Sequence, residues 1–132
     1  MNIGEAAERS GVPAKTIRYY EEIALIGPAA RRGNGYRDYQ WKDVETLRFI
    51  HRARGLGFTI EEVTDLLALY RDKRRASHRV KQLALKHVED IDRRIDKLKA
   101  MRDTLVDLTE KCHGDQRPDC PILADLAGEA KL

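Results

Sequence analysis

Residues 4–26 read GEAAERSGVPAKTIRYYEEIALI, and this stretch carries the signals for two short helices joined by a tight turn. Apolar residues repeat on one side of the first segment, and Gly11 then interrupts the pattern. Pro13 suits a helix start, because the first amides of a helix have no partner within it. In the second segment Ile17 and Tyr20 share one face and leave basic side chains on the others. The stretch predicts a helix-turn-helix with an exposed basic edge, with an ordinary helical hairpin as the alternative.

A basic and aromatic segment, GPAARRGNGYRDYQ, follows at residues 27–40. The pair Asn34-Gly35 suits a tight hairpin turn, whose central positions need left-handed backbone. Arginine and tyrosine side chains flank this turn on both sides. Such groups bind phosphate oxygens and fix register without reading base sequence. The segment therefore predicts a small wing that lies along a nucleic-acid backbone.

The segment from Trp41 onward predicts two further helices. Apolar residues recur at helical spacing from Trp41, which we interpret as a core residue. Gly55 and Gly57 end this helix. Thr59 then caps the next one, with Glu62 as the capping-box partner three residues later.

A stretch without proline or glycine runs from Ser77 to Lys111 and predicts one long helix. Apolar residues return along it every seven positions and form a seam, with further apolar residues beside it. A lone helix could not bury a seam of this length, so the pattern predicts a coiled coil, most simply with a second copy of the chain. The seam consists of Ala84, Ile91, Leu98 and Leu105, flanked by Val88, Ile95, Met101 and Leu108.

The seam reaches polar or reactive residues at its two ends, Ser77 and Cys112. At 1.5 Å per residue the helix is about 50 Å long, so these two residues cannot meet within one chain. In an antiparallel dimer, Ser77 would approach Cys112 of the partner subunit, and a role for Ser77 in capping the helix is compatible with this. The basic run RDKRRAS before the helix is interpreted as a solvated connector, with a second DNA-contacting patch as the alternative.

The two cysteines of the chain bracket one loop, CHGDQRPDCP, at residues 112–121. Gly114 is a stop signal for the long helix, and Cys120-Pro121 suits the N-cap and first position of a short helix. Two thiolates with few other strong donors favour a soft ion such as Cu(I), because Zn(II) prefers four ligands in a tetrahedron. A redox disulfide and zinc held with His113 are the alternatives, whereas an iron–sulfur cluster needs more cysteines.

Composition and charge narrow the class of protein. The chain has 132 residues, of which 36% are charged and 6% aromatic, which favours burial of surface between helices. Residues 31–54 contain seven Lys/Arg and three Asp/Glu, a local net of +4, whereas residues 112–132 contain two basic and four acidic residues. No apolar run approaches the roughly 18 residues of a membrane span, and the first residues lack a signal-peptide pattern. We expect a cytoplasmic protein, in which paired thiols more often form a metal or redox site than a structural disulfide.

These parts together resemble the MerR family of bacterial regulators, in its copper-responsive (CueR/HmrR-like) branch. The residues that carry the resemblance cover nearly the whole chain: GEAAERSGVPAKTIRYYEEIALI, NGYRDY, RARGLGF, the long helix and CHGDQRPDCPI. The resemblance implies a mainly α fold, with a winged helix-turn-helix DNA-binding domain over residues 1–70 and a basic connector over 71–76. It places a dimerisation helix over 77–111, and a metal-binding loop with a short helix over 112–132.

The resemblance also implies a homodimer joined by antiparallel long helices. Such a protein represses without metal and, with metal, activates copper efflux promoters for RNA polymerase by bending and untwisting DNA. Cys112 and Cys120 match the two ligands of a linear monovalent site. Ser77 matches the position where divalent-metal relatives have a third cysteine, which favours Cu(I), Ag(I) or Au(I). His113 stands where copper members often have proline, and a role for His113 as a weak third metal donor is an alternative. The DNA-contacting positions of the family match Lys15, Arg18, Tyr19, Arg31, Tyr36, Arg37 and Arg54.

Other functions fit the residues less well. A sensor of a divalent metal such as Zn(II), or a thiol redox protein, is the alternative reading. A drug sensor is disfavoured because only about 20 residues follow the long helix, too few to enclose an organic ligand. We expect no enzymatic activity, because the sequence positions no histidine and acid partner to activate a thiol.

Overall fold

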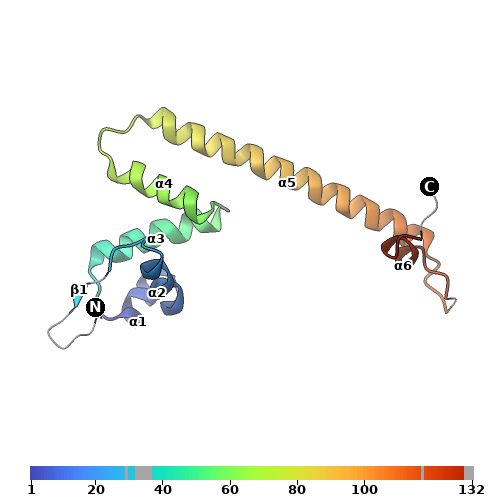
Figure 1. Cartoon of the computed structure of the whole chain (residues 1–132), viewed down its shortest axis with the longest axis horizontal. Helices are drawn as coiled ribbons and strands as arrows, with labels where there is room; N and C mark the ends of the chain where they lie inside the picture. Colours follow the sequence, from blue (N-terminus) through green and yellow to red (C-terminus); the bar gives the residue numbers. More distant parts are fainter. Residues whose placement is uncertain (29, 32–36, 117, 130–132) are drawn as a thin grey trace. The chain divides into compact units, whose positions relative to one another are not determined.

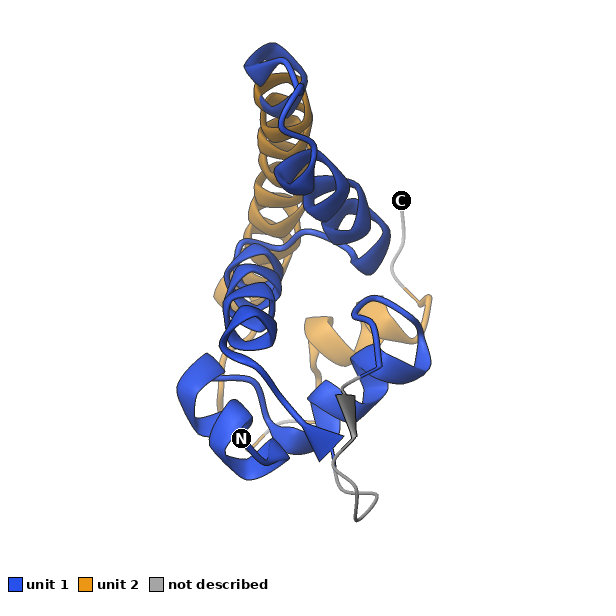
Figure 2. Cartoon of the chain, turned by 90° about the vertical axis from the view of Figure 1, so that its left-hand side faces the viewer, with its two compact units in different colours: residues 1–80 blue, residues 81–132 orange. Residues whose placement is uncertain are grey.

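The computed structural model of the chain describes residues 1–28, 30–31, 37–116 and 118–129. Its elements, in chain order, are helices α1 (Ile3–Ser10) and α2 (Ala14–Glu22), strands β1 (Ala30–Arg31) and β2 (Arg37–Asp38), and helices α3 (Trp41–Gly55), α4 (Ile60–Arg71), α5 (Ser77–Lys111) and α6 (Pro121–Leu126) (Figure 1). They divide into two compact units, Met1–Val80 and Lys81–Leu132 (Figure 2). The mainly α fold predicted from the sequence is confirmed.

The first unit has one hydrophobic core, to which α1, α2, α3 and α4 all contribute. Helix α3 packs against α1 and α4, and α1 packs against α2. Apolar residues at helical spacing face inward from each helix, because burial of their side chains stabilises the packed arrangement. The core consists of Ala6, Val12, Ile17, Tyr20, Leu25, Ile26, Tyr39, Val44, Leu47, Ile50, Ala53, Val63 and Leu67.

The turn between α1 and α2 follows from its sequence. Gly11 has φ +79°, a left-handed conformation that glycine adopts at low cost, and its N–H bonds the Ala7 carbonyl at 2.9 Å. Pro13 is the N-cap of α2, and its carbonyl accepts a hydrogen bond from the Ile17 amide at 3.0 Å. The predicted helix-turn-helix is confirmed.

Helix α2 is shorter than its apolar pattern indicates. It ends at Glu22, and Ala24 then adopts φ +58°. The chain folds back so that the amides of Leu25 and Ile26 bond the Tyr20 carbonyl at 3.0 and 3.3 Å. Both side chains are buried in the core, which a straight continuation of the helix would have prevented.

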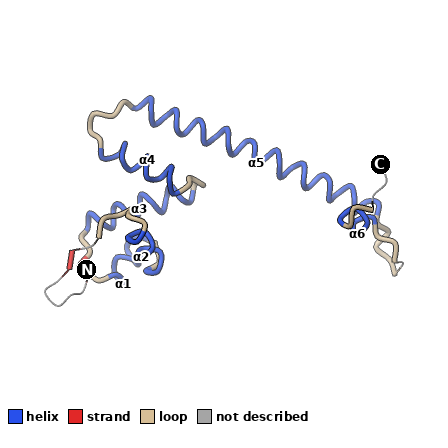
Figure 3. The backbone as a smooth tube through the Cα atoms, in the orientation of Figure 1, coloured by secondary structure: helices blue, strands red, loops and turns tan. Residues whose placement is uncertain are grey.

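The described part of the wing contains two short strands, β1 and β2, coloured as strand in Figure 3. They pair antiparallel, with Ala30 opposite Asp38 and Arg31 opposite Arg37. The predicted hairpin strands are therefore present. The predicted turn at Asn34-Gly35 lies outside the described residues.

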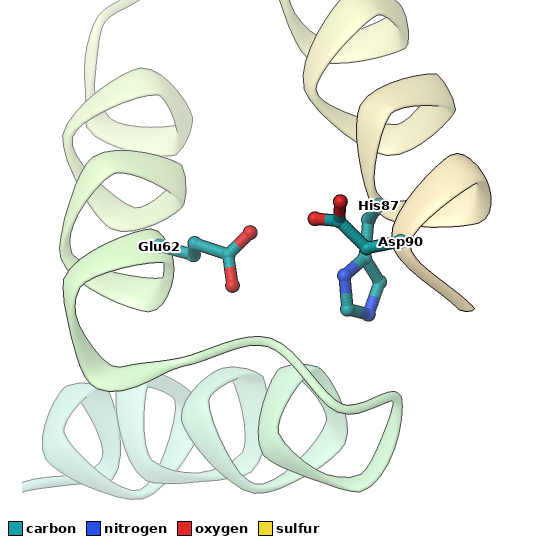
Figure 4. Close-up of side chains that lie close together, drawn as sticks. All are labelled: Glu62, His87 and Asp90. Atoms are coloured by element: carbon teal, nitrogen blue, oxygen red, sulfur yellow. The ribbon is translucent and has the colours of Figure 1, made fainter. Parts of the chain in front are cut away.

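Helix α3 ends at Gly55, as predicted, and Gly57 has φ +90° in the turn that follows. The capping box of α4 is also present. The Thr59 side chain accepts a hydrogen bond from the Glu62 amide at 3.1 Å, and the Glu62 carboxylate accepts one from the Thr59 amide at 2.9 Å. Figure 4 shows Glu62 in the first turn of α4. A cap of this kind typically stabilises a helix by about 1 kcal/mol.

The prediction that Trp41 lies in the core is wrong. Its side chain is 47% exposed, although it shares the helical spacing of the buried Val44. Trp41 is the first residue of α3, so its ring lies at the edge of the core, where two guanidiniums cover it. The Arg48 and Arg9 guanidinium carbons lie 5.2 and 5.7 Å from the ring centroid, which is the range of cation–π contacts.

Helix α5 spans the predicted range Ser77–Lys111, and all of it from Lys81 onward belongs to the second unit. In its second half the seam residues Leu98 and Leu105 and the flanking residues Ile95 and Met101 are exposed, Leu98 to 61%. Leu108 differs, because α6 lies beside the last turns of α5 and Leu108 is buried there (Figures 1 and 3). Over its described length, the long helix presents an apolar face without cover from its own chain between residues 95 and 105.

Candidate metal loop and nucleic-acid interface

The cysteine loop begins where α5 ends and finishes where α6 begins. The Cys112 amide bonds the carbonyls of Leu108 and Thr109, both at 3.2 Å, so Cys112 directly continues the last turn of α5. Gly114 then turns the chain with φ +66°. Cys120 is the N-cap of α6, and Pro121 is the first helical residue, as predicted.

Both cysteine thiols are free and half-buried. The loop returns the chain so that α6 lies beside the end of α5 (Figure 3), and residues of both helices line a common groove. The Cys120 carbonyl accepts a hydrogen bond from the Ala124 amide at 3.0 Å, which fixes the start of α6. The two ends of the loop are therefore held by secondary structure, while the segment between them carries the polar side chains.

The remaining donors near the thiols are exposed. His113, Asp115 and Asp119 all lie on the surface of the loop. Two half-buried sulfurs with only exposed nitrogen and oxygen donors beside them fit a soft ion bound mainly through sulfur. Ser77, the other predicted metal-selectivity residue, is the first residue of α5 and is separated from Cys112 by that 35-residue helix.

An ion pair lies at the helix end next to the loop. The Lys111 ammonium lies 2.9 Å from the Asp107 carboxylate one turn earlier. This hydrogen bond and the Asp107 charge raise the pKa of Lys111 above its ordinary value. Both side chains are exposed, so the pair contributes little to stability.

The predicted DNA-contacting residues of α2 lie on its outer side. Lys15, Arg18 and Tyr19 are exposed, while Ile17 and Tyr20 between them are buried. The outer side of the helix therefore carries two cations and a phenol, side chains that suit a recognition helix.

The remaining predicted DNA-contacting residues differ in their exposure and in their contacts within the chain. Arg54 is exposed and donates from Nη1 to the Phe58 carbonyl at 2.7 Å, so one of its donors closes the turn before α4. Arg31 lies on β1 opposite Arg37, and Tyr36 lies outside the described residues. Arg37 is half-buried, and its guanidinium contacts an acidic residue of α2.

That acidic residue is Glu21, which the sequence analysis did not single out. Its carboxylate accepts a hydrogen bond from the Tyr39 hydroxyl on Oε1, and its Oε2 lies 3.2 Å from Arg37 Nε. Glu21 and Tyr39 are 18 residues apart, and the contact joins the recognition helix to the end of the wing. The available signal was the position of Glu21, one turn after the buried Ile17 and therefore on the inner side of α2.

Tyr39 is expected to remain protonated well above pH 10 in the folded protein. Burial, then the hydrogen bond and charge of Glu21, raise its pKa above the ordinary tyrosine value, and Arg37 and Arg18 lower it by less. Because the pKa rises on folding, the stabilisation is present at neutral pH and is lost as the pH rises through the folded-state pKa. A spectrophotometric titration of the five tyrosines should show one late phenolate that Tyr39→Phe removes. Ionisation of all tyrosines near pH 10 in the folded protein would contradict this.

Some polar groups lie outside both the cysteine loop and the candidate DNA-binding face. On α5, His87 and Asp90 are one turn apart (Figure 4), and Asp90 pairs with Arg93 on the same helix. Asp72 caps the end of α4, and Arg75 donates to its carbonyl at 3.1 Å within the basic connector. No described helix combines the length and the apolarity that crossing a bilayer requires.

The geometry defines a class of protein. A helix-turn-helix with an exposed basic face, a two-stranded wing and a long helix with an uncovered apolar seam are the parts of a DNA-binding transcriptional regulator. A family model described as "MerR HTH family regulatory protein" matches residues 1–69, and one described as "MerR, DNA binding" matches residues 44–108.

The chain belongs to the MerR family. It is 58% identical over 130 residues to the HTH-type transcriptional regulator HmrR of Rhizobium leguminosarum, covering 98% of this chain and 100% of the relative. It is 54% identical over 133 residues to heavy metal-dependent transcription regulator 2 of Rhizobium meliloti, covering 100% and 90%. The crystal structure of PbrR691 from Ralstonia metallidurans in complex with lead(II) matches with a TM-score of 0.83 and 28% identity, over 96% of this chain and 98% of that one. These relatives place the chain in the heavy-metal-responsive branch of the family.

Proposed function

We propose that the protein is a Cu(I)-responsive transcriptional activator that also accepts Ag(I) or Au(I). The observation that carries this proposal is the loop at the end of α5, where two free, half-buried thiols are held at the end of one helix and the N-cap of the next. A metal bound there would supply a cross-link between the two ends of the loop. Cys112 and Cys120 would hold it.

The donor set supports a monovalent ion over a divalent one. Zn(II) and similar ions prefer four ligands, whereas thiolate sulfur selects Cu(I) among the common physiological metals. The resemblance matches Ser77, a weak donor, to the position of a third cysteine in divalent-metal relatives. The lead(II) complex of PbrR691 favours the alternative, a divalent sensor, but that chain shares only 28% of its residues with this one.

A second copy of the chain completes the proposed regulator. The uncovered apolar face from Ile95 to Leu105 supports the pairing of two α5 helices, and the resemblance implies that they run antiparallel. In that pairing Ser77 and Cys112 of the partner subunit would come together. The two winged domains would then bind promoter DNA, and metal would activate transcription by RNA polymerase through bending and untwisting of that DNA.

The proposal is tested by a metal competition on the reduced protein. Titration with Cu(I) and with Zn(II), each against a competing chelator, is expected to show tight Cu(I) binding and weak Zn(II) binding. The physical reason is the small sulfur-dominated donor set. Equal affinities, or a preference for Zn(II), would overturn the monovalent assignment.

Ser77→Cys is the matched variant for this test. A third thiolate at the shared site is expected to raise Zn(II) affinity clearly while Cu(I) binding stays tight. No gain in Zn(II) affinity would argue that Ser77 does not approach the partner's Cys112.

A further inference from the structure

The carboxylate of Glu21 is almost enclosed, and both of its oxygens are used. Its side chain is 9% exposed and lies in the last turn of α2. One oxygen accepts from Tyr39, whose own side chain is 1% exposed and belongs to the core. The other lies 3.2 Å from Arg37 Nε. Glu21 is therefore fixed from the core side and can in turn fix Arg37.

The ion pair with Glu21 is made through one edge of the Arg37 guanidinium. The 3.2 Å contact is from Nε, and the two terminal nitrogens carry four further N–H donors, which suit a phosphate acceptor. The Arg37 side chain is 32% exposed, and Arg37 lies on β2 opposite Arg31. An arginine held in this way keeps its planar fork in one orientation, so less side-chain entropy is lost when it binds a phosphate.

We propose that Glu21 is a positioning residue for DNA binding, which holds the Arg37 guanidinium toward the phosphate backbone and fixes the wing to the recognition helix. This inference rests on the proposed DNA-binding function. It adds an acidic residue to a set of predicted DNA-contacting residues that are basic or aromatic. An acid on the recognition helix then strengthens binding to a polyanion.

Simple electrostatics predicts the opposite sign. A negative charge beside DNA repels it, so removal of the Glu21 charge should strengthen binding and should do so for any DNA sequence. If Glu21 acts by positioning Arg37, its removal weakens binding to the specific site. The direction of the effect therefore separates the two explanations.

The experiment measures binding of a duplex selected from a random pool by the unmodified protein, over a range of salt concentrations. Glu21→Gln is expected to weaken binding about fivefold to tenfold, because Arg37 must then be ordered by the DNA itself. The salt dependence should also fall by about one phosphate contact, as it should for Arg37→Ala.

Glu21→Asp is the charge-matched control. It keeps the net charge but draws the carboxylate back by one methylene, away from Arg37. Positioning predicts weaker binding for this variant as well, whereas a pure charge effect predicts none. Thermal unfolding of each variant tests whether the first unit remains folded. Tyr39→Phe removes the hydroxyl but keeps the pair between Glu21 and Arg37, so its DNA binding should fall less than that of Glu21→Gln.

A double-mutant cycle identifies the residue through which Glu21 acts. The Glu21→Gln/Arg37→Ala protein should bind no more weakly than Arg37→Ala alone. With Lys15→Ala, six residues earlier on α2, the effect of Glu21→Gln should instead be additive.

Unchanged or tighter binding by Glu21→Gln would overturn the inference, as would an additive result with Arg37→Ala. Failure of the proposed function is a separate result, since it would appear in the unmodified protein as an absence of selective DNA binding.

Discussion

Cys112→Ser is expected to abolish metal-driven transcription while leaving DNA binding nearly unchanged. Cys112 follows the last turn of α5 in the second unit, whereas the exposed cations of α2 belong to the first. Mutation of groups that merely support a metal ligand already costs about 10–100-fold in affinity, so loss of one of two thiolates should exceed about 100-fold for Cu(I). In vitro transcription with added Cu(I), together with duplex binding in its absence, measures both effects.

His113→Asn is the matched control for this experiment. It removes the neighbouring imidazole and leaves both sulfurs in place. If metal-driven transcription survives in His113→Asn and is lost in Cys112→Ser and Cys120→Ser, the two thiols are the sensor. Activation that survives loss of either cysteine would remove the loop from the mechanism.

Leu98→Asp is expected to convert the proposed dimer into a monomer. Leu98 lies in the uncovered seam of α5 and is 61% exposed in the single chain. Burial of a leucine contributes about 1.5–3 kcal/mol, and a symmetric pair loses it twice. Burial of two carboxylates adds a further penalty, so the dimer dissociation constant should rise by at least about 100-fold. Analytical ultracentrifugation over a concentration series measures this change.

Ala100→Asp controls for the introduced charge. Ala100 is exposed on the same helix, two residues further on, which places it on nearly the opposite side from Leu98. This variant should remain dimeric. A dimer that persists in Leu98→Asp, or dissociates equally in both variants, would rule out the seam as the interface.

The sequence predicted turns and helix ends well, because the residues that form each of them lie next to one another in the chain. Gly11 turns the chain between α1 and α2, and Thr59 forms its box with Glu62. Cys120 caps α6 because a proline follows it. Each of these depends on backbone groups within one turn of the residue concerned, so no distant contact can change the outcome.

The predictions that failed involved competition between local pattern and packing. Trp41 keeps the spacing of a core residue, but its side chain at the start of α3 is 47% exposed and contacts the guanidiniums of Arg9 and Arg48. The apolar run after Glu22 continued the helical pattern. Burial of Leu25 and Ile26 decided instead for a reversal of the chain.

Periodicity, caps and turn residues act over short distances, so the helix-turn-helix, the long helix with its apolar seam and the loop closed by two cysteines follow from the order of the residues. The contact of Glu21 with Tyr39 and Arg37 depends on packing between segments far apart in the chain. The sequence offers many basic and hydroxyl side chains that could contact a carboxylate on a helix. Which of them it meets depends on how β2 and the adjoining Tyr39 pack against α2, and Tyr39 is held there by the shared core.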